Sequence, residues 1–181
     1  MQDTIDYEVR IKAIYREHYR DVYQYLYYFT GKREHAEDLT QEVFIRVLDA
    51  LGRYEERSSV KTWILHIAKH VAIDDYRKRR VQTLFGMELL KGLPSLLGRP
   101  EAELVSKEEQ LEIEQAMQKM KPHHRNVLIL RGIKVYSIRE TAEILGTSEA
   151  KVRVDFHRAT KELKKVLHVD WIGGLANEYS K

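Results

Sequence analysis

The sequence contains no cysteine and only three prolines among its 181 residues. Without cysteine, the chain can form no disulfide, use no thiol nucleophile and hold no cysteine-ligated zinc. No stretch approaches the ~20 consecutive apolar residues that a membrane-spanning helix needs. Residues 1–9 also lack the basic-then-apolar order of a secretory signal. Together these absences predict an intracellular, cytoplasmic protein.

Signatures of catalysis are also missing. There is no glycine-rich phosphate loop and no Gly-x-Ser-x-Gly elbow. His66, His70 and Asp74 recur every four residues, but three ligands on one straight helix span ~12 Å, too far for one ion with ~2 Å ligand distances. His66 and His70 alone lack the glutamate of a metalloprotease motif. We therefore expect no catalytic residue, metal, cofactor or small-molecule substrate.

Charge is abundant but nearly balanced. Charged residues make up 33% of the chain, and the formal net charge is only +3. A small excess of base does not by itself indicate nucleic acid, so the distribution of charge decides. Hydrophobic residues make up 43%, which is enough for a packed core.

Apolar residues at helical spacing predict three helices in the first half: residues 7–29, residues 33–51, and a helix that begins near Ser59 and ends in a basic run at 77–80. Gly31 and Gly52 are suitable helix ends. Residues 83–100 break the pattern with Gly and Pro, which predicts a linker. The chain is therefore predicted to be all-α, with two helical domains (1–82 and 101–181) joined by a flexible linker (83–100).

The predicted linker is unusually apolar. Its members are Leu84, Phe85, Met87, Leu89, Leu90, Leu93, Leu96 and Leu97. These side chains could pack on a neighbouring domain, form a short helix or bind a partner, and association with a membrane is a further alternative.

The second half has the layout of a helix-turn-helix. An acidic helix from Glu101 ends at Pro122, and a helix over 123–133 follows it. Ser137 and Glu140 then have the spacing of a capping box at the start of a helix over 137–145. A tight turn at Gly146 leads to a longer helix over 149–166. Small and apolar residues on the two helices would form their shared core.

The last helix is basic, with six Lys or Arg against three acids between Glu149 and Lys165. Arginine in the first turns of such a helix can pair two donors with guanine in a major groove. The alternative is an ordinary solvated face. We expect Asp155 to pair with Arg158 or Arg139. The predicted groove-facing residues are Lys151, Arg153, Val154, His157, Arg158 and Lys161.

Three further motifs carry a resemblance to a known family. Residues 36–48 (AEDLTQEVFIRVL) resemble the polymerase-binding helix of bacterial sigma factors, residues 58–68 (SSVKTWILHIA) resemble their promoter-melting segment, and the ending at 74–80 (DDYRKRR) is also typical. The helix-turn-helix looks like the domain that reads the −35 element. Length and domain plan resemble the extracytoplasmic-function group, and the resemblance covers roughly residues 11–167.

The resemblance implies an alternative sigma factor that binds core RNA polymerase and directs promoter-specific initiation. Its partner would be the clamp coiled coil of the largest polymerase subunit. A helix face that mixes acids with apolar residues suits a protein partner and would repel DNA. We expect Phe44 to be exposed on this helix. The matching contact positions are Asp38, Gln41, Glu42, Phe44 and Leu48.

The same resemblance assigns residues 54–62 to a loop that captures a base flipped from the −10 element. Trp63 would stack on a base or lie in the core. The candidates for polar base contacts are Ser58, Ser59, Lys61 and Thr62. The candidates for phosphate contacts are Lys69, Arg77, Lys78, Arg79 and Arg80.

The chain departs from housekeeping sigma factors at one pair of residues. Those proteins have two adjacent tryptophans where this chain has Trp63 and Ile64, so we expect strict dependence on a good promoter match. The resemblance also implies an anti-sigma factor, which could hold the chain at the membrane. The alternative is a stand-alone helix-turn-helix regulator, which would usually dimerise on a palindrome.

Overall fold

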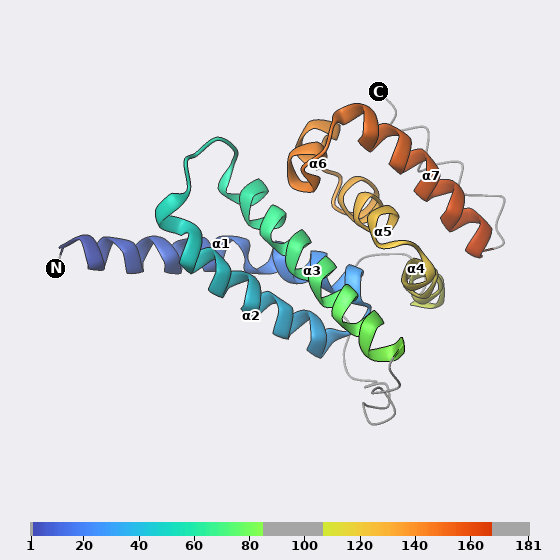
Figure 1. The fold of residues 1–181 in the computed structure, drawn as a ribbon, viewed down its shortest axis with the longest axis horizontal. Coiled ribbons are helices and arrows are strands. Elements are labelled where there is room, and N and C mark those ends of the chain that lie inside the picture. Colours follow the sequence, from blue (N-terminus) through green and yellow to red (C-terminus); the bar gives the residue numbers. More distant parts are fainter. Residues whose placement is uncertain (1, 85–106, 168–181) are drawn as a thin grey trace.

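The computed structural model describes residues 2–84 and 107–167, and every regular element within these two ranges is helical (Figure 1). The all-α prediction is therefore confirmed for this part of the chain. Residues 85–100 of the predicted linker lie outside the described residues. The elements are α1 (Gln2–Thr30), α2 (Arg33–Ala50), the 3₁₀ turn η1 (Leu51–Arg53), α3 (Val60–Leu84), α4 (Lys107–Lys119), α5 (Pro122–Leu128), the π-helical turn η2 (Ile129–Ile133), α6 (Ile138–Leu145) and α7 (Glu149–Leu167).

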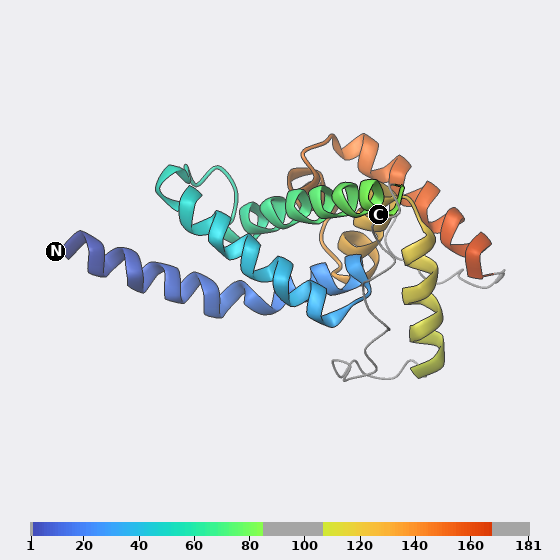
Figure 2. The same cartoon turned by 60° about the horizontal axis from the view of Figure 1, so that its bottom comes forward.

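Helices α1, α2 and α3 pack together as the N-terminal domain. Val22, Val43 and Ile64 have no exposed surface, and each comes from a different helix. Gly31 ends α1 in the left-handed region (φ +68°), which glycine adopts without penalty. The first turns of α1 project beyond the rest of the domain (Figure 2).

The C-terminal domain contains α4 to α7. The predicted capping box is confirmed: the Ser137 hydroxyl accepts from the Glu140 amide, and the Glu140 carboxylate accepts from the Ser137 amide. Gly146 then ends α6 with φ +64°, and the Ser148 hydroxyl caps α7 by accepting from the Lys151 amide. Ala142 of α6 is buried, and α6 packs against α7.

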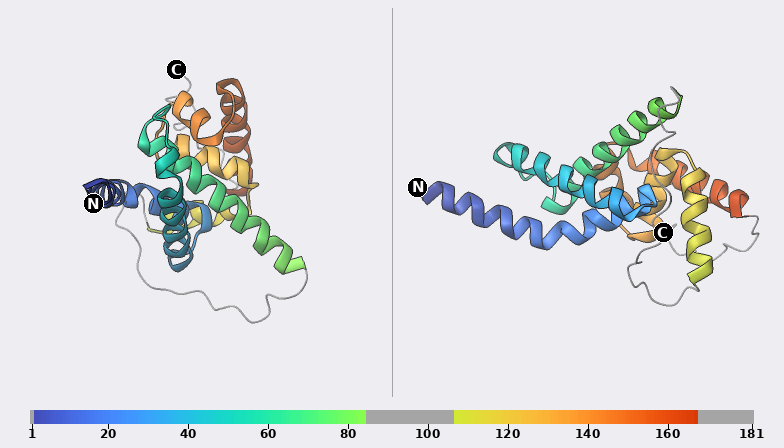
Figure 3. Two further views of the ribbon diagram at one scale, coloured as in Figure 1. Left: turned by 60° about the vertical axis from the view of Figure 1, so that its left-hand side comes forward. Right: turned by 90° about the horizontal axis from the view of Figure 1, so that it is seen from below.

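The two domains also pack against each other (Figure 3). Helix α3 contacts α6, and α1 contacts α4, η2 and α5. The Tyr25 hydroxyl donates to Asn126 Oδ1 at 2.7 Å, and both residues are buried. Arg125 Nη1 donates to the Phe29 carbonyl at 2.6 Å. The linker between the domains is thus not their sole connection.

Among the helices of residues 2–84 and 107–167, none combines the length and apolar character that crossing a bilayer requires.

Candidate nucleic-acid and protein interfaces

All six predicted groove-facing residues of α7 are exposed. Their spacing of three or four residues places them on one side of the helix. The other side contributes Val152, Ala159 and Leu163 to the core. Because this burial fixes how α7 is rotated, the outward face is set by packing. It presents a basic surface with Val154 (47% exposed) at its centre.

Two ion pairs within α7 organise this surface. Lys151 Nζ lies 2.7 Å from Asp155 Oδ2, and Arg153 Nη2 lies 3.5 Å from Glu149 Oε2. The expected pairing of Asp155 with Arg158 or Arg139 is therefore wrong. Asp155 is 9% exposed on the inner side of α7, within reach of a residue one turn earlier. Arg139 instead pairs with Glu143 on α6.

Helix α2 presents a surface of different chemistry. Asp38, Gln41, Leu48 and Asp49 are exposed, and so is Ile45 at 58%. Glu42 is already paired within α2, because its carboxylate accepts a hydrogen bond from Arg46 Nη2 at 2.5 Å. Arg46 also lies 3.6 Å from the Asp74 carboxylate on α3. The outward face of α2 therefore combines acids with uncovered aliphatic side chains.

Phe44 corrects the sequence prediction, because it is not exposed. Only 7% of its surface is accessible, and its ring lies 4.7 Å from that of Tyr15 and 6.3 Å from that of Tyr19 on α1. The helical spacing that placed Phe44 near the acids did not show that α1 covers it. The exposed apolar members of α2 are Ile45 and Leu48 instead.

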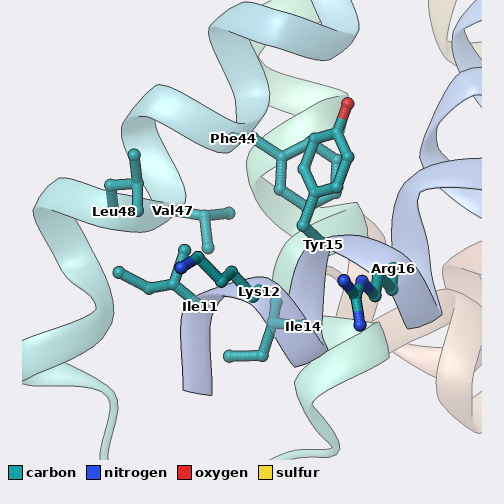
Figure 4. Close-up of a pocket in the computed structure, with 8 residues that line it drawn as sticks. All are labelled: Ile11, Lys12, Ile14, Tyr15, Arg16, Phe44, Val47 and Leu48. Carbon is teal, nitrogen blue, oxygen red and sulfur yellow. The ribbon is translucent and has the colours of Figure 1, made fainter. Parts of the chain in front are cut away.

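A shallow apolar groove lies between α1 and α2, beside this face (Figure 4). Ile11 and Tyr15 line it from α1, and Phe44, Val47 and Leu48 line it from α2. Sequence reasoning missed the α1 side. The available signal was the apolar stripe of α1 continuing to Ile11, together with a tyrosine repeated every four residues.

The predicted −10 segment contains the start of α3 and the loop before it. The Ser59 hydroxyl accepts from the Thr62 amide at 3.1 Å, which caps α3. Only 6% of the Thr62 surface is exposed. Its side chain therefore supports the start of α3. Trp63 is half-buried, with its ring 4.7 Å from that of Tyr54. The Tyr54 hydroxyl donates to the Ser58 carbonyl and closes the loop.

Lys61 faces the C-terminal domain. Its ammonium lies 2.8 Å from Asp21 Oδ2 and 5.3 Å from the centre of the Tyr136 ring. Burial of Lys61 disfavours its charged form, but hydrogen bonding to Asp21 and Tyr136, together with their charges, outweighs burial and raises the pKa of Lys61. No periodicity in the sequence indicates this contact between Lys61 and Tyr136 of the other domain.

The basic end of α3 divides into free and paired members. Arg77, Lys78 and Arg80 are exposed. Arg79 Nε lies 3.1 Å from Asp75 Oδ2, and Asp75 also contacts His35 Nε2 at 2.8 Å. Burial acts to raise the pKa of Asp75, but hydrogen bonding to His35 and the charge of Arg79 outweigh it and lower that pKa.

Lys69 and the histidines of α3 form a small polar group. Lys69 Nζ lies 3.0 Å from His70 Nε2, which lies 3.2 Å from His66 Nε2. Burial lowers the pKa of both Lys69 and His70. Within the described part of the chain, no three His, Asp or Glu side chains are placed to hold a metal ion.

Comparisons with known proteins agree with this arrangement. Residues 14–81 match the family model described as Sigma-70 region 2, and residues 110–163 match Sigma-70, region 4. The ECF RNA polymerase sigma factor SigX of Bacillus subtilis (strain 168) is 40% identical over 163 residues, which cover 87% of this chain and 84% of SigX. The RNA polymerase sigma factor YlaC of the same organism is 36% identical over 86% of this chain and 90% of YlaC.

Solved structures share the fold. The sigma factor RpoE of Bartonella quintana, in complex with the anti-sigma factor NepR, superposes with a TM-score of 0.68 and 23% identity over 91% of this chain and 98% of that one. The level of identity to SigX over most of both chains, together with the two regional matches in order, establishes the family. This chain belongs to the ECF RNA polymerase sigma factors.

Proposed function

We propose that this chain binds core RNA polymerase through the exposed face of α2 and directs it to promoters whose −35 element α7 reads and whose −10 element α3 reads. One observation carries the proposal: the chain exposes two helix faces of opposite chemistry. Acids with aliphatic side chains lie outward on α2, and basic side chains lie outward on α7. DNA attracts the second face and repels the first.

The α2 face suits a helical protein partner. Asp38, Gln41 and Glu42 can accept hydrogen bonds from basic side chains, while Ile45 and Leu48 supply apolar area at the centre. The groove beside Leu48 has room for a side chain of the partner. We infer that the partner is the clamp coiled coil of the largest polymerase subunit. Phe44 would contribute indirectly, because its buried ring fixes the position of α2 against α1.

The α7 face suits a major groove. Arg153 and Arg158 can each pair two donors with a guanine edge, and the Val154 side chain can contact a thymine methyl group. Lys151, His157 and Lys161 flank them and would position the helix on phosphates and base edges. Helix α6 with its capped start would hold α7 at the angle that this docking needs.

The start of α3 and the loop before it would capture an unstacked base of the −10 element. Ser58 and Lys61 supply polar groups, Ser59 stands exposed at the rim, and the Trp63 ring supplies a stacking surface beside Tyr54. Thr62 would support this site by completing the cap of α3. Lys69, Arg77, Arg79 and Arg80 would contact phosphates, with Arg79 first giving up its pairing to Asp75.

This role implies the class of protein, its place in the cell and a regulatory partner. The chain would act as an initiation factor and not as an enzyme, so the chemistry of RNA synthesis would belong to the polymerase. It would work in the cytoplasm, where polymerase and promoters are found. An anti-sigma factor would be its regulatory partner, by analogy with the complex in which RpoE was solved.

Run-off transcription from a promoter library tests the proposal. Purified chain added to core polymerase should produce new start sites that share −10 and −35 sequences, whereas core alone should not. The matched control replaces Glu17, an exposed acid on α1 outside the α2 face, with Lys. The Glu17→Lys variant should retain activity, and Asp38→Lys should lose it. Start sites unaffected by the wild-type chain would contradict the proposal.

A further inference from the structure

A second pocket lies where the turn between α1 and α2 meets the end of α3 and helices α4 and α5. Its volume of about 370 Å³ is within the range of small-molecule sites. Among the described residues that line it, four are Lys or Arg and only one is an acid. The ionisable side chains of the lining are Lys32, His35, Asp75, Arg79, Arg80 and Arg125. The pocket is therefore basic, although the chain as a whole is nearly balanced in charge.

The one carboxylate neutralises only one of these cations. Arg79 Nε lies 3.1 Å from Asp75 Oδ2, and Arg79 Nη2 donates to His35 Nδ1 at 2.6 Å. Because Nδ1 accepts, the His35 Nε2–H donates to Asp75 at 2.8 Å, and this histidine is neutral. Within residues 2–84 and 107–167, Lys32 and Arg80 pair with no carboxylate. The start of α2, which has no side-chain cap, adds the partial positive charge of a helix N-terminus.

Arg125 is the most deeply buried cation of the pocket, with 3% of its surface exposed. Its guanidinium donates only to neutral oxygens: the carbonyls of Phe29, Gln118 and Met120 at 2.6, 2.7 and 3.2 Å, and Gln118 Oε1 at 3.0 Å. In the described part of the chain, its Nε has no acceptor. A buried charge without a counter-charge is costly, and burial lowers the pKa of Arg125. An anion in the pocket would supply the missing negative charge.

Packing fixes this arrangement before any ligand arrives. Gly31 has φ +68°, and a Cβ on it would lie 2.9 Å from Gln118 Cδ, so the turn after α1 approaches α4 as closely as a glycine allows. The Gln118 side chain donates to the Tyr28 carbonyl at 3.3 Å and accepts from Arg125. Both groups of its amide are thus engaged, which holds the guanidinium in place. A site formed in advance loses little affinity to the ordering of its own side chains.

We propose that this pocket binds a small phosphate-bearing compound, with its phosphate groups near Lys32, Arg80 and Arg125. A carboxylate offers one negative charge to three uncompensated cations, whereas a phosphate monoester carries about −1.5 to −2 at neutral pH and a diphosphate carries more. Guanidinium groups also match phosphate oxygens in geometry. The half-buried ring of Tyr76 lines the pocket and offers a contact for an organic part. A small compound can enter this recess more readily than a DNA backbone can, because Arg125 is almost wholly covered.

Calorimetric titration of the full chain with inorganic pyrophosphate and, separately, with ADP tests the proposal. The wild-type chain should bind at least one of them, and the tighter probe distinguishes an inorganic from a nucleotide ligand. Lys32→Glu reverses an exposed charge of the pocket and should weaken binding about tenfold or more. The matched control, Lys165→Glu, makes the same change at an exposed position in the last turn of α7, outside the pocket, and should bind as wild type does.

Nuclear magnetic resonance of ¹⁵N-labelled chain locates the bound probe. The side-chain amide of Gln118 and the backbone amide of Gly31 should shift as the tighter probe is added, because both lie at the pocket. Gly52, beyond the far end of α2, should not shift.

Four outcomes would overturn the proposal. The first is that the wild-type chain binds neither probe at concentrations up to ~5 mM, where a site with a millimolar Kd would be filled. The second is equal weakening in Lys32→Glu and Lys165→Glu, which would indicate a general effect of charge. The third is binding without a shift at Gln118 and Gly31.

The fourth outcome would assign the pocket to nucleic acid instead. A short single-stranded oligonucleotide without a −10 element would then displace the probe from the wild-type chain and would itself bind more weakly to Lys32→Glu. The titrations contain neither polymerase nor promoter, so their failure would leave the proposed function as it stands. That function fails separately if the run-off experiment yields no promoter-specific transcript.

Discussion

Helices α2 and α7 are nearly equal in length, at 18 and 19 residues, yet they expose opposite surfaces. Each buries an aliphatic stripe in its own domain, with Val43 and Val47 on α2 and Val152 and Leu163 on α7. The difference lies entirely on the outward faces. The core side determines which residues face outward, and the outward residues determine the class of partner. The two faces can therefore be altered separately without changing either fold.

The largest expected effect is on polymerase binding by α2. Reversing the charge of Asp38 while replacing Leu48 with Glu should weaken binding to core polymerase by at least ~100-fold, because a reversed charge opposite its former partner costs several kcal/mol. Fluorescence titration of labelled chain with core polymerase measures this. Glu17→Lys is the control for a change of charge alone. Wild-type affinity in the double variant would remove α2 from the interface.

The next effect concerns base readout by α7. Replacing Arg158 with Ala should cost ~1–3 kcal/mol on the preferred −35 sequence if the guanidinium pairs with guanine, and should relax the preference at that base pair. Selection of −35 variants by holoenzyme measures both. Lys161→Ala is the comparison, since loss of a phosphate contact weakens all sequences alike. Uniform losses with Arg158→Ala would refute base readout at that position.

A smaller effect concerns the capping box at the start of α6, the helix that packs against α7. Ser137→Ala should lower the free energy of unfolding by about 1 kcal/mol, because the hydroxyl that accepts from the Glu140 amide is lost. Denaturant titration measures this. Lys32 occupies the corresponding position before α2 but makes no side-chain capping bond, so Lys32→Ala should leave stability unchanged. Equal losses in both variants would mean that the capping box contributes nothing specific.

The smallest expected effect is an acid dependence of the packing between the two domains. Asp21 on α1 pairs with Lys134 of the C-terminal domain, and its pKa is lowered from the ordinary value of 3.8, so its charged form stabilises this packing at neutral pH. This contribution is fully present above pH ~4 and is lost as the pH falls through the lowered pKa. Energy transfer between dyes attached at Lys12→Cys on α1 and Arg139→Cys on α6, both at exposed positions of a chain without cysteine, should stay constant from neutral pH to ~5 and then fall under acid. Opening between pH 7 and 5 would point to a histidine instead.

Local signals predicted much of this architecture. Some features depend only on residues within a few positions of each other, and the structure confirms them. They are the capping pair Ser137 and Glu140, the helix end at Gly31 and the exposure of the predicted groove-facing residues of α7. The roles assigned to the outward residues stay predictions until the experiments above are done.

Contacts between distant segments could not be predicted in this way. Helical spacing on α2 is the same whether or not α1 covers Phe44, so its burial needed the packed domain. Tyr25 and Asn126 lie 101 positions apart, and no periodicity connects them. Asp155 had several basic neighbours within reach, and only the rotation of α7 selects Lys151.

The separation of roles between α2 and α7 is tested most directly by measuring the affinity of core polymerase for Asp38→Lys and Arg158→Ala in one titration series. The Asp38→Lys chain should lose core affinity, while the Arg158→Ala chain should bind core as wild type does and fail only in promoter choice. Loss of core affinity in Arg158→Ala, or its retention in Asp38→Lys, would contradict the account.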